Sequence, residues 1–200
     1  RAGHHQITDH GIALGSVVGI HRVATDILLN HFRLRRQCQQ VAVADRDAHA
    51  LVRDGVYSSL LKPRQAKLHE KAAQWYRDQD TALCAQHLDR AGHPSAANAY
   101  LVAANNQADV LRYESSIAFC RRGLELAVQA SEISNLNCAL GEALLNTKAT
   151  EAAIEVFKSA VAHAPDDPAK AKALIGLAAA LRIADRQALA FAPLDEAQRL

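Results

Sequence analysis

Aromatic residues are scarce in this chain. They make up 4% of its 200 positions, although hydrophobic residues as a whole make up 50%. Sheet sandwiches fill their cores with β-branched and aromatic side chains, so this composition disfavours a sheet protein. Alanine is abundant instead. It is the best helix former, and its small side chain lets helices approach closely. The composition therefore favours an all-α protein made of packed helices.

A marked excess of charge of one sign is also missing. The chain has 23 Lys and Arg residues against 21 Asp and Glu, which gives a formal net charge of +2. Proteins that bind nucleic acids or membrane surfaces usually carry a clear basic patch. The densest basic run is Arg33, Arg35 and Arg36, which we interpret as a solvated helix end. We therefore expect neither a nucleic acid nor a membrane as partner.

Cysteine is scarce and irregularly spaced. The residues are Cys38, Cys84, Cys120 and Cys138, and no two of them form a CxxC pair. A chain of this length does not need disulfide staples, so we expect reduced thiols and a cytoplasmic location. No apolar run approaches the ~18 residues of a membrane span. The chain begins at Arg1 and stops inside an amphipathic pattern, so we expect it to be a piece of a longer protein.

Patterns for catalysis are missing as well. The stretch GIALGS at 11–16 has glycines spaced loosely like those of a phosphate-binding loop, but no lysine precedes its serine. The stretch 69–73 begins like a zinc-protease helix, but Ala73 stands where the second histidine would be. We therefore expect no catalytic residue, no cofactor, no metal and no small-molecule substrate.

A period of about 3.6 residues runs through most of the chain and predicts helix after helix. The predicted helices cover 23–34, 64–77, 80–91, 96–108, 113–128, 135–145, 151–163, 169–183 and 186–199, and the segment 41–48 is predicted to be a short strand. The loops between the later helices are short, so sequential helices should pack antiparallel.

Several residues have the chemistry of helix ends. Gly92 suits a left-handed helix end, and Pro94 suits the first turn of the next helix. Thr150 and Asp185 are predicted N-caps, and Asp167 is predicted to cap the helix that opens with Pro168.

The best-defined unit is the stretch Ser134–Asp167, SNLNCALGEALLNTKATEAAIEVFKSAVAHAPDD. If its 34 residues are numbered from Ser134, positions 7, 8, 11, 20, 24, 27 and 32 are Leu140, Gly141, Leu144, Ala153, Phe157, Ala160 and Pro165. This pattern resembles the tetratricopeptide repeat, although Asn137 and Leu144 stand where that repeat usually has aromatics. A shift of 37 residues gives related units at about 97–130 and 171–200.

The small residues of the unit have a mechanical reason. Gly141 and Ala153 are predicted to lie where the two helices of a pair cross, and Ala160 where the pair meets the next one. Phe157 is predicted to fill the space between neighbouring pairs. The period of 37 implies about three extra residues in a turn or helix, and Pro193 should bend or delay the last helix. A non-repeating helical bundle stays open as the alternative.

A second resemblance covers residues 49–76, HALVRDGVYSSLLKPRQAKLHEKAAQWY, and extends over 82–108 and 112–127. These segments are similar to large signalling ATPases of the STAND type, in which a winged-helix region precedes a helical repeat array. Some members carry an adenylate or guanylate cyclase domain, and others a LuxR-type DNA-binding domain. The resemblance implies a degenerate winged-helix remnant over 1–62 and a repeat domain over 63–200.

The resemblance to tetratricopeptide arrays also implies a binding face. In such arrays the first helices of the pairs line a concave groove that holds a peptide or protein segment. The positions that point there correspond to Asn98, Asn105, Asp109, Asn135, Glu142, Asn146, Lys172 and Arg182. Plain solvation of a helix face is the alternative interpretation of each of these residues.

We therefore expect a protein-interaction and regulatory segment of a larger signalling ATPase or cyclase, with no catalysis of its own. The partner would be a protein or peptide segment, including domains of the parent chain. Two alternatives stay open: a fragment that takes part in the nucleotide chemistry of the parent, and a DNA-binding segment formed by the shortened winged helix at 13–61.

Overall fold

The computed structural model describes residues 55–200. The helix predicted at 23–34, the strand predicted at 41–48 and most of the winged-helix remnant predicted at 1–62 lie outside the described residues. Residues 55–59 form a short helical turn. The rest of the described chain, residues 61–200, forms one compact unit, which is considered by itself below.

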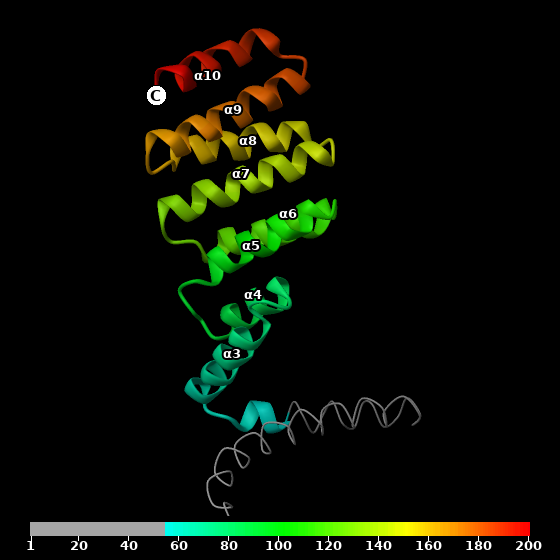
Figure 1. Ribbon diagram of the computed structural model, residues 1–200, viewed down its shortest axis with the longest axis vertical. Helices are drawn as coiled ribbons and strands as arrows, with labels where there is room; N and C mark the ends of the chain where they lie inside the picture. Colours follow the sequence, from blue (N-terminus) through cyan, green and yellow to red (C-terminus); the bar gives the residue numbers. More distant parts are fainter. Residues whose placement is uncertain (1–54) are drawn as a thin grey trace, which may run out of the picture. The chain divides into compact units, whose positions relative to one another are not determined.

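The described residues are helical and contain no strand. The helices are α3 (Lys62–Tyr76), α4 (Thr81–Arg90), α5 (Ala96–Asp109), α6 (Tyr113–Leu126), α7 (Ala130–Asn146), α8 (Thr150–Ala162), α9 (Asp167–Ile183) and α10 (Gln187–Arg199). Each helix packs against the next one in sequence, and α5 also contacts α7, as α7 contacts α9. Figure 1 shows the helices stacked in chain order, each returning along its predecessor. The prediction of an all-α protein is confirmed.

The largest difference from the predicted boundaries lies at the start of α7. The sequence predicted a helix from residue 135, whereas α7 begins at Ala130. The extra turn is stabilised by a capping box, in which the Glu132 side chain accepts from the backbone N–H of Gln129 and the Gln129 side chain from the backbone N–H of Glu132. Two N–H groups that the helix leaves unpaired are satisfied in this way.

Three predicted N-caps were wrong by one residue. The N-cap of α9 is Asp166 rather than Asp167, because the Asp166 carboxylate accepts from the backbone N–H of Ala169 at 2.8 Å. Thr150 is the first helical residue of α8 and not its N-cap. Asp185 is in the left-handed region at φ 60°, and Arg186 occupies the cap position of α10.

Around Gly92 the prediction was half correct. Gly92 has φ 65°, the left-handed conformation expected of a helix end. The backbone N–H of His93 donates to the carbonyl of Leu88 at 2.9 Å, which closes the end of α4. Pro94, however, lies in the connection before Ser95, the N-cap of α5, and not in the first turn of that helix.

The turn inside each later helix pair recurs at a spacing of 37 residues. Leu111, Lys148 and Asp185 adopt φ values of 60°, 64° and 60°. In each turn the next residue donates its N–H to a carbonyl five residues earlier, in the pairs Arg112–Gln107, Ala149–Leu144 and Arg186–Leu181, at 2.8, 2.9 and 2.9 Å. The chain therefore reverses direction with the same geometry three times, as helix ends of the Schellman type do.

Helix length explains why this spacing is 37 residues. The first helix of the earlier pair, α5, has 14 residues, whereas α7 and α9 have 17 each. The predicted three extra residues therefore lie in a helix and not in a turn. They lengthen these helices by almost one turn, because a turn takes 3.6 residues.

The core of the array is centred on Phe157, which is 1% exposed. A Cβ built on Gly141 of α7 would stand 2.6 Å from two of its ring carbons, and a Cβ on Gly176 of α9 would also overlap the ring. Ala153 and Ala160 are fully buried beside it. The predictions that Phe157 fills the space between pairs and that Gly141 allows a close crossing are confirmed.

Polar residues inside the array are paired. Asn137, which replaces the usual aromatic, is 5% exposed and donates from Nδ2 to the hydroxyl of Ser159 at 3.1 Å. The hydroxyl of Ser134 donates to the carbonyl of Ala160 at 3.0 Å. Both bonds join α7 to α8, so they tie this pair together at the position where the repeat usually has an aromatic side chain.

An ionic clamp ties α4 to the next pair. The guanidinium of Arg122 on α6 binds both carboxylate oxygens of Asp89 on α4, at 2.8 and 2.9 Å. The hydroxyl of Tyr100 on α5 donates to the same carboxylate at 3.0 Å. Arg122 also donates to Glu125. The hydrogen bond from Arg122 is the main cause that lowers the pKa of Asp89.

Candidate functional site

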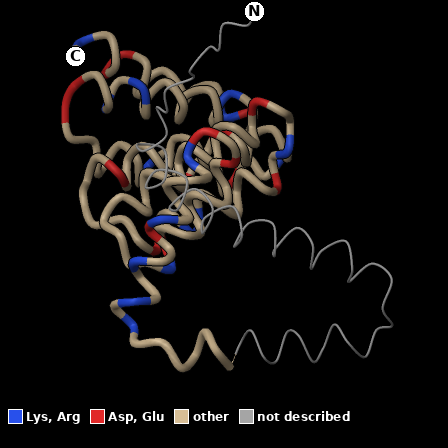
Figure 2. Tube along the Cα trace, turned by 60° about the horizontal axis from the view of Figure 1, so that its bottom comes forward, with Lys and Arg blue, Asp and Glu red and all other residues tan. Residues whose placement is uncertain are grey.

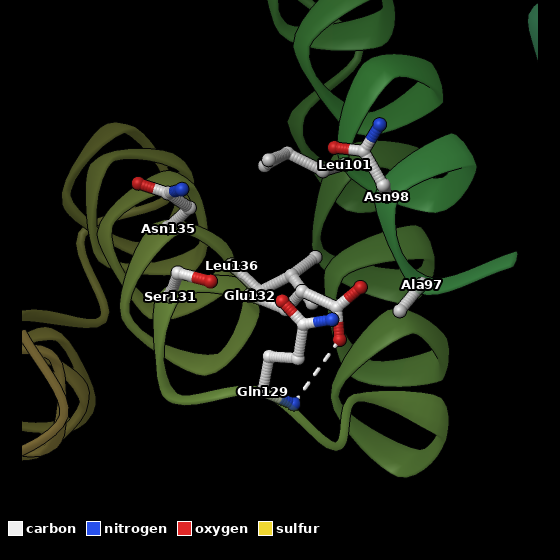
Figure 3. Close-up of a pocket in the computed structure, with 8 residues that line it drawn as sticks. All are labelled: Ala97, Asn98, Leu101, Gln129, Ser131, Glu132, Asn135 and Leu136. Atoms are coloured by element: carbon white, nitrogen blue, oxygen red, sulfur yellow. Dashed lines mark hydrogen bonds between the residues drawn. The ribbon is translucent and has the colours of Figure 1, made fainter. Parts of the chain in front are cut away.

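A hollow of about 250 Å³ opens between α5 and α7, the first helices of two successive pairs. It is lined by Ala97, Asn98, Leu101, Gln129, Ser131, Glu132, Asn135 and Leu136. Figure 3 shows Asn98 and Asn135 on opposite walls, with Leu136 between the two helices. The hollow therefore has an apolar base and amide groups at its rim. We call it the α5–α7 groove.

The carboxylate of Glu132 gives the α5–α7 groove a fixed negative group. Its Oε2 accepts from the backbone N–H groups of Val128 and Gln129 at 3.2 and 3.3 Å, and Figure 3 shows the second of these bonds. Because these bonds hold the side chain at the start of α7, the carboxylate faces the groove in one orientation. A partner amide or cation would meet it there.

The predicted groove residues all lie on the first helices of their pairs and are all exposed. Asn98, Asn105 and Asp109 belong to α5, Asn135, Glu142 and Asn146 to α7, and Lys172 and Arg182 to α9. At the spacing of 37 residues they form rows across the helices: Asn98, Asn135 and Lys172 in the first, Asn105 and Glu142 in the second, and Asp109 and Asn146 in the third.

Only part of this set is brought together in the hollow. Asn98 and Asn135 line it, whereas the other predicted residues lie further along their helices. The Nδ2 of Asn146 donates to the carbonyl of Glu142 at 2.9 Å, so this amide is engaged by its own helix.

Sequence analysis missed the contribution of Gln129, Ser131 and Glu132. It began the helix at residue 135, whereas α7 begins at Ala130. The spacing of Gln129 and Glu132 matches the capping-box pattern apart from the Gln at the cap, and this was the signal that could have placed the earlier start.

Between the polar rows lies a strip of small and apolar residues. Val102, Ala139 and Gly176 are 37 residues apart, and none of the three is buried. Ile175 is 55% exposed beside them on α9. An apolar strip between polar rows is suited to an extended peptide, whose side chains alternate while its backbone offers hydrogen bonds to both sides.

Charges of both signs lie near Cys138 of α7. Burial raises the pKa of the Cys138 thiol, Lys172 of α9 lowers it, and Glu142 of α7 raises it. Figure 2 shows acidic and basic residues interspersed over the helices rather than gathered into one field of a single sign. The described helices therefore carry charges of both signs, with no extended region of a single sign.

A second, smaller hollow of about 130 Å³ lies between α3 and α4. It is lined by Glu70, Ala73, Gln74, Arg77, Cys84, Leu88, His93 and Ser95. Both hollows are below the roughly 300–1,000 Å³ of typical small-molecule sites. They are of a size to accept a side chain rather than a cofactor.

Two histidines meet beside this second hollow. The Nδ1 atoms of His69 and His87 are 2.9 Å apart, and the ring of Tyr76 stacks on His87 with centroids 5.6 Å apart. Burial lowers the pKa of each imidazole, and Arg90 lowers it further. His87 lies in the last turn of α4, and these contacts of its ring are with residues of α3. This arrangement joins the two helices.

Within residues 55–200 no group of three or more His, Cys, Asp or Glu side chains is placed to hold a metal ion. In the same part of the chain no helix combines the length and the apolar character needed to cross a membrane. Cys84, Cys120 and Cys138 are free thiols.

Comparison with known proteins adds no family to this description. No family model matches the chain, and no curated protein matches it significantly. The class defined by the structure is an all-α array of consecutively packed helices, with a groove between α5 and α7.

Proposed function

We propose that this chain is a protein-interaction and regulatory scaffold, built as a tetratricopeptide-like superhelix, that holds a peptide or protein segment along α5, α7 and α9. The observation that carries the proposal is the α5–α7 groove, in which Asn98 and Asn135 flank an apolar base at equivalent positions of successive pairs. Asparagine both donates and accepts, so paired amides can bind a peptide backbone whatever its side chains are.

The regular geometry of the array supports this role. Three turns of similar φ recur 37 residues apart, and the first helices of successive pairs contact each other, α5 with α7 and α7 with α9. A ligand that extends along this face would meet similar groups at each step. Helical-repeat proteins use such extended surfaces for protein binding.

The proposal is tested with a library of peptides displayed on phage and selected against the folded chain. Selected peptides are then measured by fluorescence anisotropy. We expect the double variant Asn98→Ala/Asn135→Ala to weaken binding about tenfold, which corresponds to the loss of two hydrogen bonds of about 0.7 kcal/mol each. Gln187→Ala, which removes an exposed amide from α10, serves as the matched control and should bind normally.

Peptides that bind the double variant as tightly as the parent chain would show that the α5–α7 groove is not the binding face. The same conclusion would follow if Gln187→Ala weakened binding to an equal extent. Circular dichroism melts of the variants establish that any loss is local, since all three side chains are exposed.

We further propose that the scaffold belongs to a signalling ATPase of the STAND type, associated with a nucleotide cyclase or a LuxR-type regulator, and acts in the cytoplasm without catalysis of its own. The segments at 49–76, 82–108 and 112–127 support this assignment. The gene's reading frame upstream of the Arg1 codon tests it. A phosphate-binding loop and a cyclase or regulator domain are expected there, and a frame with neither would overturn the assignment.

A further inference from the structure

The α5–α7 groove carries charge of one sign. Among the described residues that line it, Glu132 is the one with a charged side chain, and the other polar ones are the neutral Asn98, Gln129, Ser131 and Asn135. In the part of the chain that the structure describes, Glu132 forms no ion pair with a basic side chain. The groove therefore presents a negative charge that the described helices do not neutralise.

One oxygen of this carboxylate is engaged and the other is available. Oε2 of Glu132 accepts the backbone N–H groups of Val128 and Gln129 at 3.2 and 3.3 Å. No group of residues 55–200 donates to Oε1. The side chain is half-buried, and Figure 3 shows its carboxylate on the side of α7 that faces α5. A ligand would thus meet an acceptor that is already oriented, which lowers the entropic cost of binding.

The groups around this carboxylate suit a guanidinium best. A guanidinium has five N–H donors in a planar fork, so it can donate to Oε1 of Glu132 and to an amide oxygen of Asn98 or Asn135. Its apolar stem would lie along Leu101 and Leu136, which also line the groove. The ammonium of a lysine is a compact charge without this fork, and an acidic or phosphorylated side chain would meet a like charge.

We propose that the α5–α7 groove selects peptide segments that carry an arginine, whose guanidinium pairs with Glu132 inside the groove. The proposal rests on the peptide-binding function proposed above and adds the chemistry of the ligand. Charge complementarity identifies this occupant, because the groove offers one unpaired carboxylate among neutral polar groups. The proposal holds whether the segment belongs to a separate protein or to another part of a longer chain, since the groove recognises the side chain and not the origin of the segment.

The experiment compares two forms of one peptide. The peptides selected on phage against the folded chain should share an arginine at a common position. One of them is synthesised with a fluorescent label, and again with citrulline in place of that arginine, which keeps the shape of the side chain and removes its charge. By anisotropy, citrulline should weaken binding to the parent chain about tenfold, because a hydrogen bond between two charged groups is lost.

A second arm varies the protein. Glu132→Gln removes the charge but keeps a side-chain oxygen for the N–H groups at the start of α7, because glutamine also serves at this position of a capping box. The arginine and citrulline peptides should bind this variant about equally, which completes a double-mutant cycle between the two charges. Glu114→Gln is the matched control. It removes an exposed carboxylate from the first turn of α6, outside the groove, and should leave the tenfold difference unchanged.

The proposal is overturned if the selected peptides share no arginine, if citrulline costs no affinity for the parent chain, or if Glu132→Gln and Glu114→Gln have equal effects. In each of these cases a loss of binding in Asn98→Ala/Asn135→Ala would still support the peptide-binding function. A selection that yields no peptide would overturn both proposals, so the two failures are distinguishable.

Discussion

The ring of Phe157 lies against Gly141, so close that a Cβ on the glycine would stand 2.6 Å from two ring carbons. The ring cannot turn away, because Gly176 confines it from the side of α9. Glycine inside a helix normally costs about 1 kcal/mol relative to alanine. Because Gly141 has no side chain, α7 can pack closely against the ring of Phe157.

Gly141→Ala should therefore lower the free energy of unfolding by about 1–3 kcal/mol, the usual range for overpacking a core. Replacing an uncrowded helical glycine by alanine would instead raise the free energy of unfolding. Urea unfolding followed by circular dichroism measures the change. Adding Phe157→Leu to Gly141→Ala should recover part of the loss, and a Gly141→Ala chain more stable than its parent would contradict the packing described.

Lys148→Gly should raise the free energy of unfolding. Lys148 is exposed and has φ 64°, a conformation that costs a residue with a side chain about 1 kcal/mol but is easy for glycine. Thermal melts are expected to show a gain of about 0.5–1 kcal/mol. Lys158→Gly, in the middle of α8, is the control and should destabilise by about 1 kcal/mol. Equal effects at the two positions would argue against the left-handed turn.

Acid should weaken the clamp between α4 and α6. Arg122 holds the pKa of Asp89 below its usual value, so the unfolded chain takes up a proton at this site before the folded chain does. The stabilisation is complete above about pH 4 and is lost as the pH falls below that value. Urea titrations of the parent chain and Asp89→Asn should differ at pH 7, and the difference should shrink as the pH falls below about 4. A difference that does not change with pH would point to packing rather than charge.

The buried thiols should resist modification. Burial raises the pKa of Cys120 to about 12 and also raises those of Cys138 and Cys84, but Cys84 is only half-buried. With Cys38→Ser to remove the fourth thiol, a disulfide reagent at pH 8 should label Cys84 about a hundredfold faster than the other two. Peptide mapping by mass spectrometry identifies the site. Rapid labelling of Cys120 in native conditions would mean that the array opens there.

Much of the helical order follows from the sequence because local and tertiary preferences agree. Alanine-rich stretches with apolar residues at a period of 3.6 predicted every helix from α3 to α10. Gly141 could be placed at a helix crossing, and Phe157 between neighbouring pairs, because both stand at diagnostic positions of the pattern that resembles the tetratricopeptide repeat. The turn at Gly92 was predicted because few other residues adopt positive φ easily.

Other features, such as helix caps and left-handed turns, cannot be predicted from the type of a single residue. Asp166 and Asp167 are equally suited to capping, and only the backbone geometry decides that Asp166 accepts the bond. Leucine and lysine rarely adopt the left-handed conformation, so the sequence did not predict it for Leu111 and Lys148. The hydrogen bonds across each turn impose this conformation on them. The groove residues Ser131 and Glu132 were missed because an unusual Gln cap extends α7.

Packing in this array joins helices that are neighbours or next-but-one neighbours in the sequence. Contacts of this kind need little loop closure, and chains dominated by them fold quickly. Each helix can also dock as soon as it has been synthesised, because its partner has already left the ribosome. The scaffold is thus suited to assembly from its N-terminal side during translation, with each new helix closing over the apolar surface that the previous one has just presented.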